Sequence, residues 1–158
     1  MTAISWRNLA QRLDPACEFV SPIAREQIAA AQIALKILLP DELCELLLET
    51  DGIIGHYGSS RVWPLGRIVS DNIQFRSNLD FPKLYMPFDA LLFFGDDGGG
   101  DQYAYRILAG QIKYMDVYAW EHESDSRKWF ARGLRDYLAR SSGHAQYDPA
   151  KHGTTAAD

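Results

Sequence analysis

The sequence has little cysteine, no basic patch and no long apolar run. Its two cysteines, Cys17 and Cys44, lie far apart, which is too few for a disulfide framework and predicts the reducing setting of the cytoplasm. No window approaches the roughly 18 consecutive apolar residues of a membrane helix, and the first residues lack the features of a secretory signal, so we expect no membrane partner. The missing basic patch argues against nucleic acid as a partner, because phosphates attract Lys and Arg.

The acidic residues are concentrated in one part of the 158-residue chain, whose formal net charge is −5. Residues 95–126 contain seven Asp and Glu residues against Arg106 and Lys113, so this segment accounts for the whole acidic excess. An acidic surface of this kind suits a basic protein partner, which it would attract over a distance and contact directly.

Hydrophobic periodicity predicts helices at both ends of the chain. A short amphipathic helix is expected over 4–13, and a helical hairpin over 21–52 with Ser21-Pro22 at its start. A last helix begins at Ser124 or Asp125 and ends near residue 140. Its apolar stripe consists of Trp129, Phe130, Leu134, Tyr137 and Leu138. Between these helices lie a strand candidate over 61–65, an irregular helix or turn over 67–79, and connections over 53–60 and 80–90.

Strand patterns occupy the middle of the chain. Runs over 91–94, 102–108 and 112–118 are joined by short loops, which predicts an antiparallel meander as the central sheet. Helices, a central antiparallel sheet and a closing helix make the fold class α+β. We expect one domain over 1–140 and a disordered polar tail over 141–158.

The loop from Gly95 to Asp101 packs three carboxylates and four glycines into seven residues. One interpretation is a structural hairpin loop, in which the glycines supply positive φ angles and the aspartates bind nearby amides. A second, compatible with the first, is an acidic rim that faces a protein partner. The third is a divalent-metal site, but the spacing is not that of an EF-hand and no distal Glu completes it. The residues concerned are Gly95, Asp96, Asp97, Gly98, Gly99, Gly100 and Asp101.

Aromatic residues near this loop are the candidate anchors for a partner. Tyr103 and Tyr105 share one face of a strand, where a core position is the more common outcome. Trp120 lies beside Glu121 and Glu123 in a stretch with little apolar content, so we expect an exposed patch with Trp120 as the anchor, a core position being the alternative.

Motifs for catalysis are absent. The chain has no Gly-x-Ser-x-Gly and no Cys/His motif, and its four histidines share no ligand spacing. Asp96 and Asp101 could imitate a carboxylate pair, but a flexible loop lacks the desolvation that separates an acid from a base. We therefore expect no enzymatic activity, no cofactor and no metal.

Several separate motifs, in order along the chain, resemble the SUKH superfamily of Smi/Knr type. They lie at 28–35, 39–43, 46–52, 63–68, 95–101, 110–114 and 129–138, so that the likeness spans roughly residues 20 to 138. One position departs from the family, because Lys36 stands where a glycine usually ends the first helix of the hairpin. The resemblance implies an α+β fold and, in bacteria most often, an immunity protein that binds a toxin, frequently a nuclease. Fungal relatives are regulatory interaction proteins, and neither role is enzymatic.

Charge and resemblance together give the leading hypothesis, a bacterial immunity protein that neutralises a basic cognate toxin by occlusion. The residues expected to face the toxin are Asp96, Asp97, Asp101, Trp120, Glu121 and Glu123. The alternative is a regulatory or scaffolding adaptor that binds proteins without neutralising them. A metal-dependent hydrolase that uses the aspartates is a third hypothesis, which calorimetry with calcium or magnesium would test.

Overall fold

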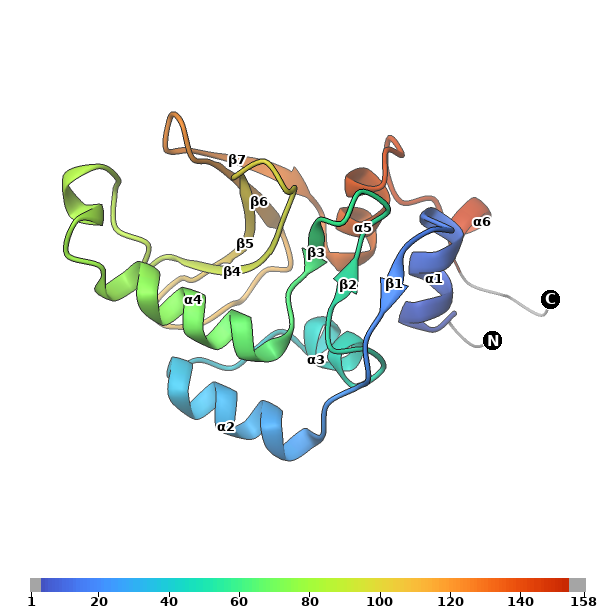
Figure 1. Ribbon diagram of the computed structural model, residues 1–158, viewed down its shortest axis with the longest axis horizontal. Helices are drawn as coiled ribbons and strands as arrows, with labels where there is room; N and C mark the ends of the chain where they lie inside the picture. The colour runs from blue at the N-terminus through green and yellow to red at the C-terminus, as the bar shows by residue number, and fades with distance from the viewer. Residues whose placement is uncertain (1–3, 154–158) are drawn as a thin grey trace.

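The computed structural model of the protein describes residues 4–153, and it has the expected α+β fold (Figure 1). The helices are α1 (Trp6–Leu13), α2 (Arg25–Leu35), α3 (Asp41–Leu47), α4 (Leu65–Ser77), α5 (Leu134–Ser141) and α6 (Pro149–His152), with a 3-10 turn at Phe81–Lys83. The strands are β1 (Glu18–Phe19), β2 (Ile53–Ile54), β3 (Ser60–Val62), β4 (Leu91–Asp96), β5 (Gln102–Arg106), β6 (Val117–Glu121) and β7 (Ser126–Ala131). None of the helices within 4–153 is long and apolar enough to cross a bilayer.

The central sheet is an antiparallel meander in the order β4-β5-β6-β7. Its fourth strand corrects the expectation that a helix begins at Ser124 or Asp125, because residues 126–131 pair with β6. Phe130 suits the helical spacing of Leu134, Tyr137 and Leu138 only by coincidence, since it packs from β7 onto the Tyr137 ring at 6.0 Å. β6 also begins later than expected, at Val117, after a two-residue turn at 109–110.

A second, three-stranded sheet in the order β1-β2-β3 was not expected. Residues 53 and 54 had been assigned to a connection, but they pair with both β1 and β3. A strand of two residues is too short to show alternation, so periodicity could not find it. The amide of Trp63, just after β3, donates to the Phe94 carbonyl over 2.7 Å and joins this sheet to β4.

The helical hairpin forms, with shifted ends. α2 begins at Arg25 rather than Pro22, and Gln27 accepts the Ala24 amide at 2.8 Å. Lys36 ends α2 in the left-handed conformation at φ 59°, although any residue with a Cβ pays of order 1 kcal/mol there. α3 ends at Leu47, before the end of the hairpin expected at residue 52, and α4 is a regular helix where an irregular helix or a turn was expected.

Residues 141–153, which the sequence assigns to a disordered tail, instead close the fold against α1. The His144 ring nitrogen Nε2 lies 3.0 Å from the Leu13 carbonyl, and Asp136 accepts the Tyr147 amide at 2.7 Å. His152 in α6 is buried. Buried polar partners therefore order a segment whose composition alone is small and polar. Residues 154–158 of that expected tail lie outside the described part.

Both faces of the four-stranded sheet are covered. On one face, Tyr137 of α5 packs against Phe94 and Tyr103, with ring centroids 5.0 Å apart in both pairs. On the other face, α4 and the connection over residues 78–90 cover Phe93 and Trp120. This connection, called the lobe from here on, protrudes at the left of Figure 1 beyond the end of α4.

Candidate functional site

The loop between β4 and β5 is closed by its own backbone and carboxylates. The amide of Asp97 donates to the Asp101 carbonyl over 3.2 Å. Asp96 accepts the Gly98 amide and Asp97 accepts the Gly99 amide, each at 2.8 Å. These are the self-contained bonds that the hairpin-loop interpretation predicts.

Two glycines of this loop are needed for space. A Cβ on Gly95 would lie 2.1 Å from the Arg61 carbonyl oxygen, so β3 and β4 approach too closely there for any other residue. Gly100 has φ 107°, and a Cβ on it would come within 2.7 Å of the His122 ring. The loop sequence is thus constrained by packing, whatever else it does.

Two of the three loop carboxylates are occupied by internal partners. Asp96 accepts the Trp63 indole N–H at 2.8 Å and forms an ion pair with Arg67 at 3.2 Å. Asp101 lies 2.8 Å from Nδ1 of His122 and accepts the His122 amide at 3.1 Å. The side-chain hydrogen bond with Asp101, followed by the charges of neighbouring acids, raises the pKa of His122.

The remaining predicted carboxylates lie at the surface. Asp97 and Glu123 are exposed, and Glu121 is half-buried with Lys128 at 3.2 Å. The contact between His122 and Asp101 brings the β6–β7 turn beside the loop, so the three surface carboxylates share one edge of the molecule. Asp97, Glu121 and Glu123 are called the acidic rim below.

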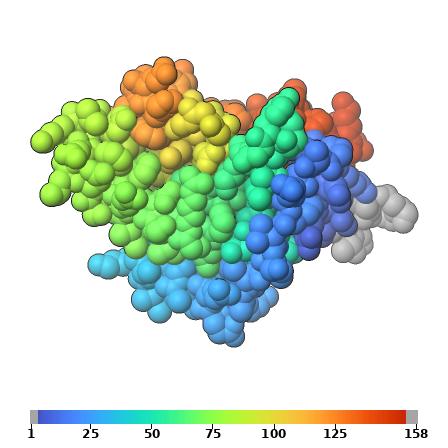
Figure 2. All heavy atoms as spheres, in the orientation of Figure 1, coloured from blue at the N-terminus to red at the C-terminus, as the bar shows by residue number. Residues whose placement is uncertain are grey.

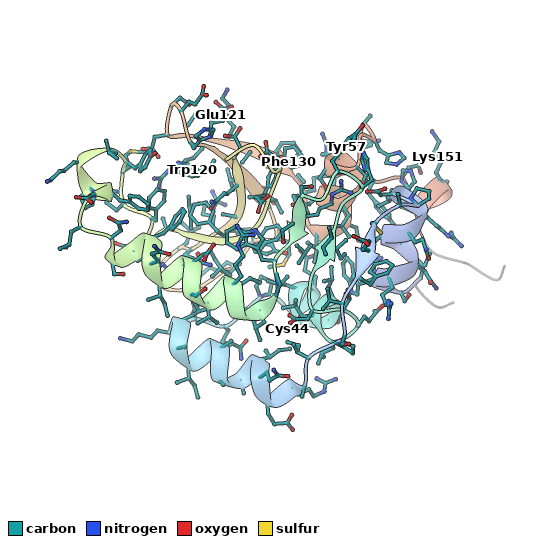
Figure 3. All side chains as sticks on the ribbon, in the orientation of Figure 1. Cys44, Tyr57, Trp120, Glu121, Phe130 and Lys151 are labelled. Carbon is teal, nitrogen blue, oxygen red and sulfur yellow. The ribbon has the colours of Figure 1, made fainter. Side chains whose placement is uncertain are left out.

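Trp120 is not the exposed anchor that the sequence predicts. Only 4% of its surface is accessible, and its indole N–H donates to Asp125 over 2.8 Å. Figure 3 places it between the lobe and the sheet, where the rings of Tyr85 and Phe88 lie 5.2 and 5.3 Å away. Its charged sequence neighbours suggested exposure, but the lobe covers this face of the sheet. Tyr105, expected in the core, is fully buried.

A cavity of about 300 Å³ opens beside the loop. Five segments meet around it: the β2–β3 turn, β3, the loop itself, β5 and the end of α5. Its lining residues are His56, Tyr57, Ser59, Arg61, Asp96, Asp97, Tyr103, Ser141, Ser142 and Gly143. Burial, then the charges of Asp97 and Asp101, raises the pKa of Tyr103 to about 12, so its phenol keeps its proton.

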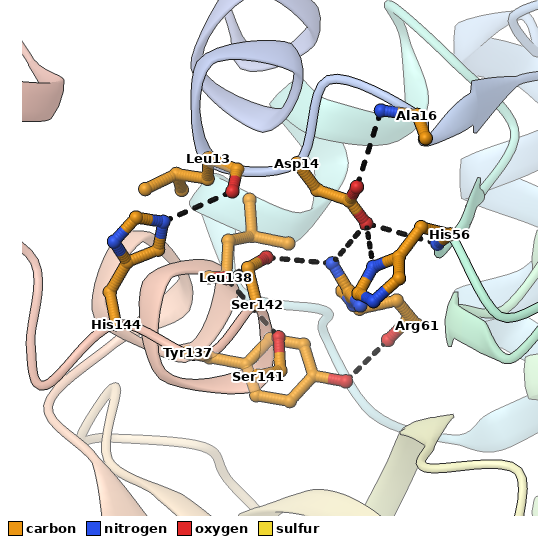
Figure 4. Close-up of polar contacts among 10 residues, drawn as sticks. All are labelled: Leu13, Asp14, Ala16, His56, Arg61, Tyr137, Leu138, Ser141, Ser142 and His144. Carbon is orange, nitrogen blue, oxygen red and sulfur yellow. Dashed lines mark hydrogen bonds and ion pairs between the residues drawn. The ribbon is translucent and has the colours of Figure 1, made fainter.

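The wall of this cavity contains a buried polar network centred on Asp14 (Figure 4). One carboxylate oxygen accepts the His56 amide at 3.0 Å, lies 2.8 Å from His56 Nδ1 and pairs with Arg61 at 3.0 Å. Arg61 also donates to the Ser142 hydroxyl over 2.6 Å, and Tyr137 donates to the Arg61 carbonyl. Burial alone would raise the pKa of Asp14, but the His56 hydrogen bonds and the Arg61 charge outweigh it and lower the pKa.

An Asp–His pair beside a cavity invites comparison with a nucleophilic site, which needs a nucleophile within hydrogen-bond reach of the base. Within residues 4–153, no hydroxyl or thiol is hydrogen-bonded to the His56 ring. Ser142 instead donates to the Leu138 carbonyl over 2.6 Å. Burial raises the pKa of Cys17 to about 11, which disfavours its thiolate. The arrangement therefore favours a structural role for the network, which ties α1, β3 and α5 together.

The network was not predicted because its members lie far apart in the sequence. Asp14 is separated from His56 by 42 positions and from Arg61 by 47. The one available signal was Arg61, a charge next to the apolar pair Val62-Trp63, since a buried charge requires a partner. In the part of the chain that the structure describes, no group of three His, Cys, Asp or Glu side chains could hold a metal ion.

A larger, apolar groove of about 700 Å³ lies away from the loop, between α2 and the β5–β6 connection. Ile33 is 78% exposed and Leu38 is 75% exposed. The lining residues are Ala29, Gln32, Ile33, Lys36, Ile37, Leu38, Gly110, Gln111 and Ile112, among which Lys36 carries the only charge.

Comparison with protein families finds a match that covers most of the chain. The family model described as SMI1-KNR4 cell-wall, SUKH_6, matches residues 25–138, which include the hairpin, the central sheet and the first half of α5. The search of curated proteins finds no match to the chain.

Proposed function

Because the chain belongs to the SUKH family, we propose that it is a bacterial immunity protein that binds and neutralises a cognate protein toxin. The toxin would carry a basic surface, as a nuclease does to hold the phosphates of its substrate. By covering that surface the chain would occlude the toxin, a role that depends on binding and needs no catalysis.

The acidic rim is the observation that carries this proposal. The loop and the β6–β7 turn come together at one edge, and Asp97 and Glu123 are exposed there. Asp96 and Asp101, which were also expected to face the toxin, are held by Arg67 and His122 and act as supports behind the rim. Charges at the edge of an interface mainly raise the association rate and choose the partner.

Growth assays test the proposal directly. The protein that co-purifies with the chain from its native strain is expressed in a susceptible host, with and without the chain. We expect growth to stop without the chain and to resume with it. If the co-purified protein is harmless, the adaptor hypothesis takes the place of immunity.

The role of the rim is tested by binding kinetics with that toxin. The Asp97→Asn/Glu123→Gln variant should associate several-fold more slowly at low salt and show a weaker dependence on salt. Glu26→Gln/Glu45→Gln is the matched control, because it removes the same charge from exposed positions on α2 and α3. Equal rates for the two variants would remove the rim from the interface.

A further inference from the structure

We propose that the lobe, residues 78–90, is the apolar anchor of the toxin interface, and that it enters an apolar recess surrounded by basic residues on the toxin. The inference rests on the proposed function. It assigns most of the free energy of toxin binding to a surface outside the acidic loop.

The lobe exposes large apolar side chains close together. Leu79 is 87% exposed, Leu84 is 66% exposed and Met86 is 59% exposed, all within eight residues of one connection. Single exposed apolar residues are ordinary, but a cluster surrounded by polar groups marks an interaction site. Methionine is also enriched at the centres of protein interfaces.

The lobe is held in one conformation by its own aromatic rings, which pack against rings of α4 and the sheet. Rings of α4, the lobe and the sheet pack with centroids 5.2 to 6.1 Å apart. The cluster consists of Phe75, Phe81, Tyr85, Phe88, Phe93 and Trp120. A loop that is already ordered loses less conformational entropy on binding, so more of its contact energy appears as affinity. Trp120 therefore contributes to the interface indirectly, because it packs against Tyr85 and Phe88 and keeps the lobe ordered.

The β6–β7 turn holds the lobe main chain in place. Asp125 accepts the Met86 amide at 2.8 Å, and Arg127 donates to the Met86 and Pro87 carbonyls over 2.7 and 2.8 Å. Asp125 and Arg127 also pair with each other at 3.1 Å. Both polar backbone groups of Met86 are satisfied internally, while its side chain faces outward.

The same turn makes the lobe continuous with the acidic rim. Glu121 and Glu123 lie on this turn, and the exposed Asp80 and Asp89 lie on the lobe itself, together with one exposed cation, Lys83. Figure 2 shows the lobe, in light green, against the orange β6–β7 turn, with the yellow loop beside it. Four carboxylates against this one lysine leave the surroundings of the apolar centre acidic. Such a surface complements a recess in a basic surface, in the arrangement of anchor and polar rim typical of interfaces.

The groove on α2 lacks this complementarity. It exposes Ile33 and Leu38 to a similar extent, but its lining contains Lys36 and no carboxylate. A basic toxin is therefore expected at the lobe rather than the groove, and Ile33 provides a matched control for Leu84.

The test uses full-length chain and the toxin that the growth assay identifies. Leu84→Ala/Met86→Ala should raise Kd by at least about tenfold, as expected for anchor residues. Ile33→Ala/Leu38→Ala, which truncates two side chains that are somewhat more exposed than these, should leave Kd unchanged. All four positions are at the surface, so both variants should unfold at the wild-type temperature.

Opposite charges at one position test the chemistry of the recess. Leu84→Lys should weaken binding more than Leu84→Glu, because a basic recess repels the lysine. The pair Ile33→Lys and Ile33→Glu should show no such order. The inference is overturned if Leu84→Ala/Met86→Ala binds with the wild-type Kd, or if Leu84→Lys and Leu84→Glu have equal Kd. The proposed function still stands in that case, provided that the wild-type chain neutralises the toxin. Failure of the wild-type chain to bind or neutralise any toxin overturns both.

Discussion

The two ends of the molecule are held together by different chemistry. Where α1, β3 and α5 meet, a buried carboxylate, Asp14, binds Arg61 and His56. Where α4, the lobe and the sheet meet, aromatic rings are stacked edge to face around Trp120. An ion pair depends on each of its partners, whereas a ring cluster spreads its energy over many contacts. The polar end should therefore be the more sensitive to single changes, and the aromatic end the more tolerant.

Removal of Asp14 should have the largest effect on stability. Asp14→Ala leaves the buried Arg61 without its carboxylate, which costs about 3–5 kcal/mol of unfolding free energy. Chemical denaturation of wild type and variant measures this loss of unfolding free energy. Asp14→Ala/Arg61→Met, which removes both charges, should recover part of the loss. If the single variant is as stable as wild type, the comparison between the two ends fails.

Trp120→Phe should cost less, about 2 kcal/mol. Phenylalanine keeps a ring in the cluster but loses the N–H bond to Asp125 and leaves part of the indole volume empty. Trp129→Phe is the matched control, because Trp129 is 46% exposed on β7, and it should cost under about 0.5 kcal/mol. Denaturation curves for the pair should separate clearly, and identical curves would contradict the buried position of Trp120.

Acid should weaken the polar end more than the aromatic end, because two carboxyl groups with a lowered pKa lie at the polar end and one lies at the other. Asp14 and Asp136 lie there, and in each case hydrogen bonds and cationic partners outweigh burial and lower the pKa below 3.8. A lowered pKa adds stability that is complete above the unfolded value and is lost as pH falls through the folded value. Glu42, whose pKa is raised chiefly by burial, acts in the opposite direction.

The pH prediction is checked by denaturation at pH 5 and at pH 3. The unfolding free energy of wild type should fall from pH 5 to pH 3. That of Asp14→Asn should fall less, because asparagine has no carboxylate to take up a proton at this position. Asp125→Asn reports the same property at the aromatic end, where the pKa of Asp125 is also lowered. An Asp14→Asn profile parallel to that of wild type would count against the network as a source of stability.

The smallest effect is expected at the rim. Asp97→Asn should change the unfolding free energy by less than about 0.5 kcal/mol, because the side chain is exposed and an amide oxygen can still accept the Gly99 amide. Asp96→Asn should cost about 1–2 kcal/mol through its bonds to Trp63 and Arg67. Equal stability of the two variants would mean that the loop carboxylates do not divide into supporting and exposed ones.

Local sequence patterns predicted much of the fold. The alternation of Tyr103 and Tyr105 located β5, and the Leu91–Phe94 run located β4, so the first two strands of the meander followed from the sequence. The two helices of the expected hairpin also form, with Pro40 directly before α3, where its missing backbone donor costs nothing. These features depend on neighbours in the sequence.

Features that depend on distant residues were not predictable. Trp120 is flanked by charges, and rings from the lobe, α4 and β4, all more than 25 residues earlier in the chain, make it a core residue. The polar network joins residues 14, 56, 61 and 142, which no spacing connects. Phe130 fitted a helical stripe, but pairing of β7 with β6 decided its structure. Tertiary contacts overrode local preference in each case.

The contact between His144 and Leu13 spans 131 positions of the chain and bears on how the protein is made. Synthesis proceeds from the N-terminus, so α1 leaves the ribosome long before its last partner exists. Arg61 is likewise synthesised 81 positions before Ser142, to whose hydroxyl it donates a hydrogen bond. The polar end can close only when residues 142–144 have been translated, whereas the lobe and the sheet are complete by residue 131. The stability that these contacts give to the polar end is therefore gained only after Ser142 and His144 have been added to the growing chain.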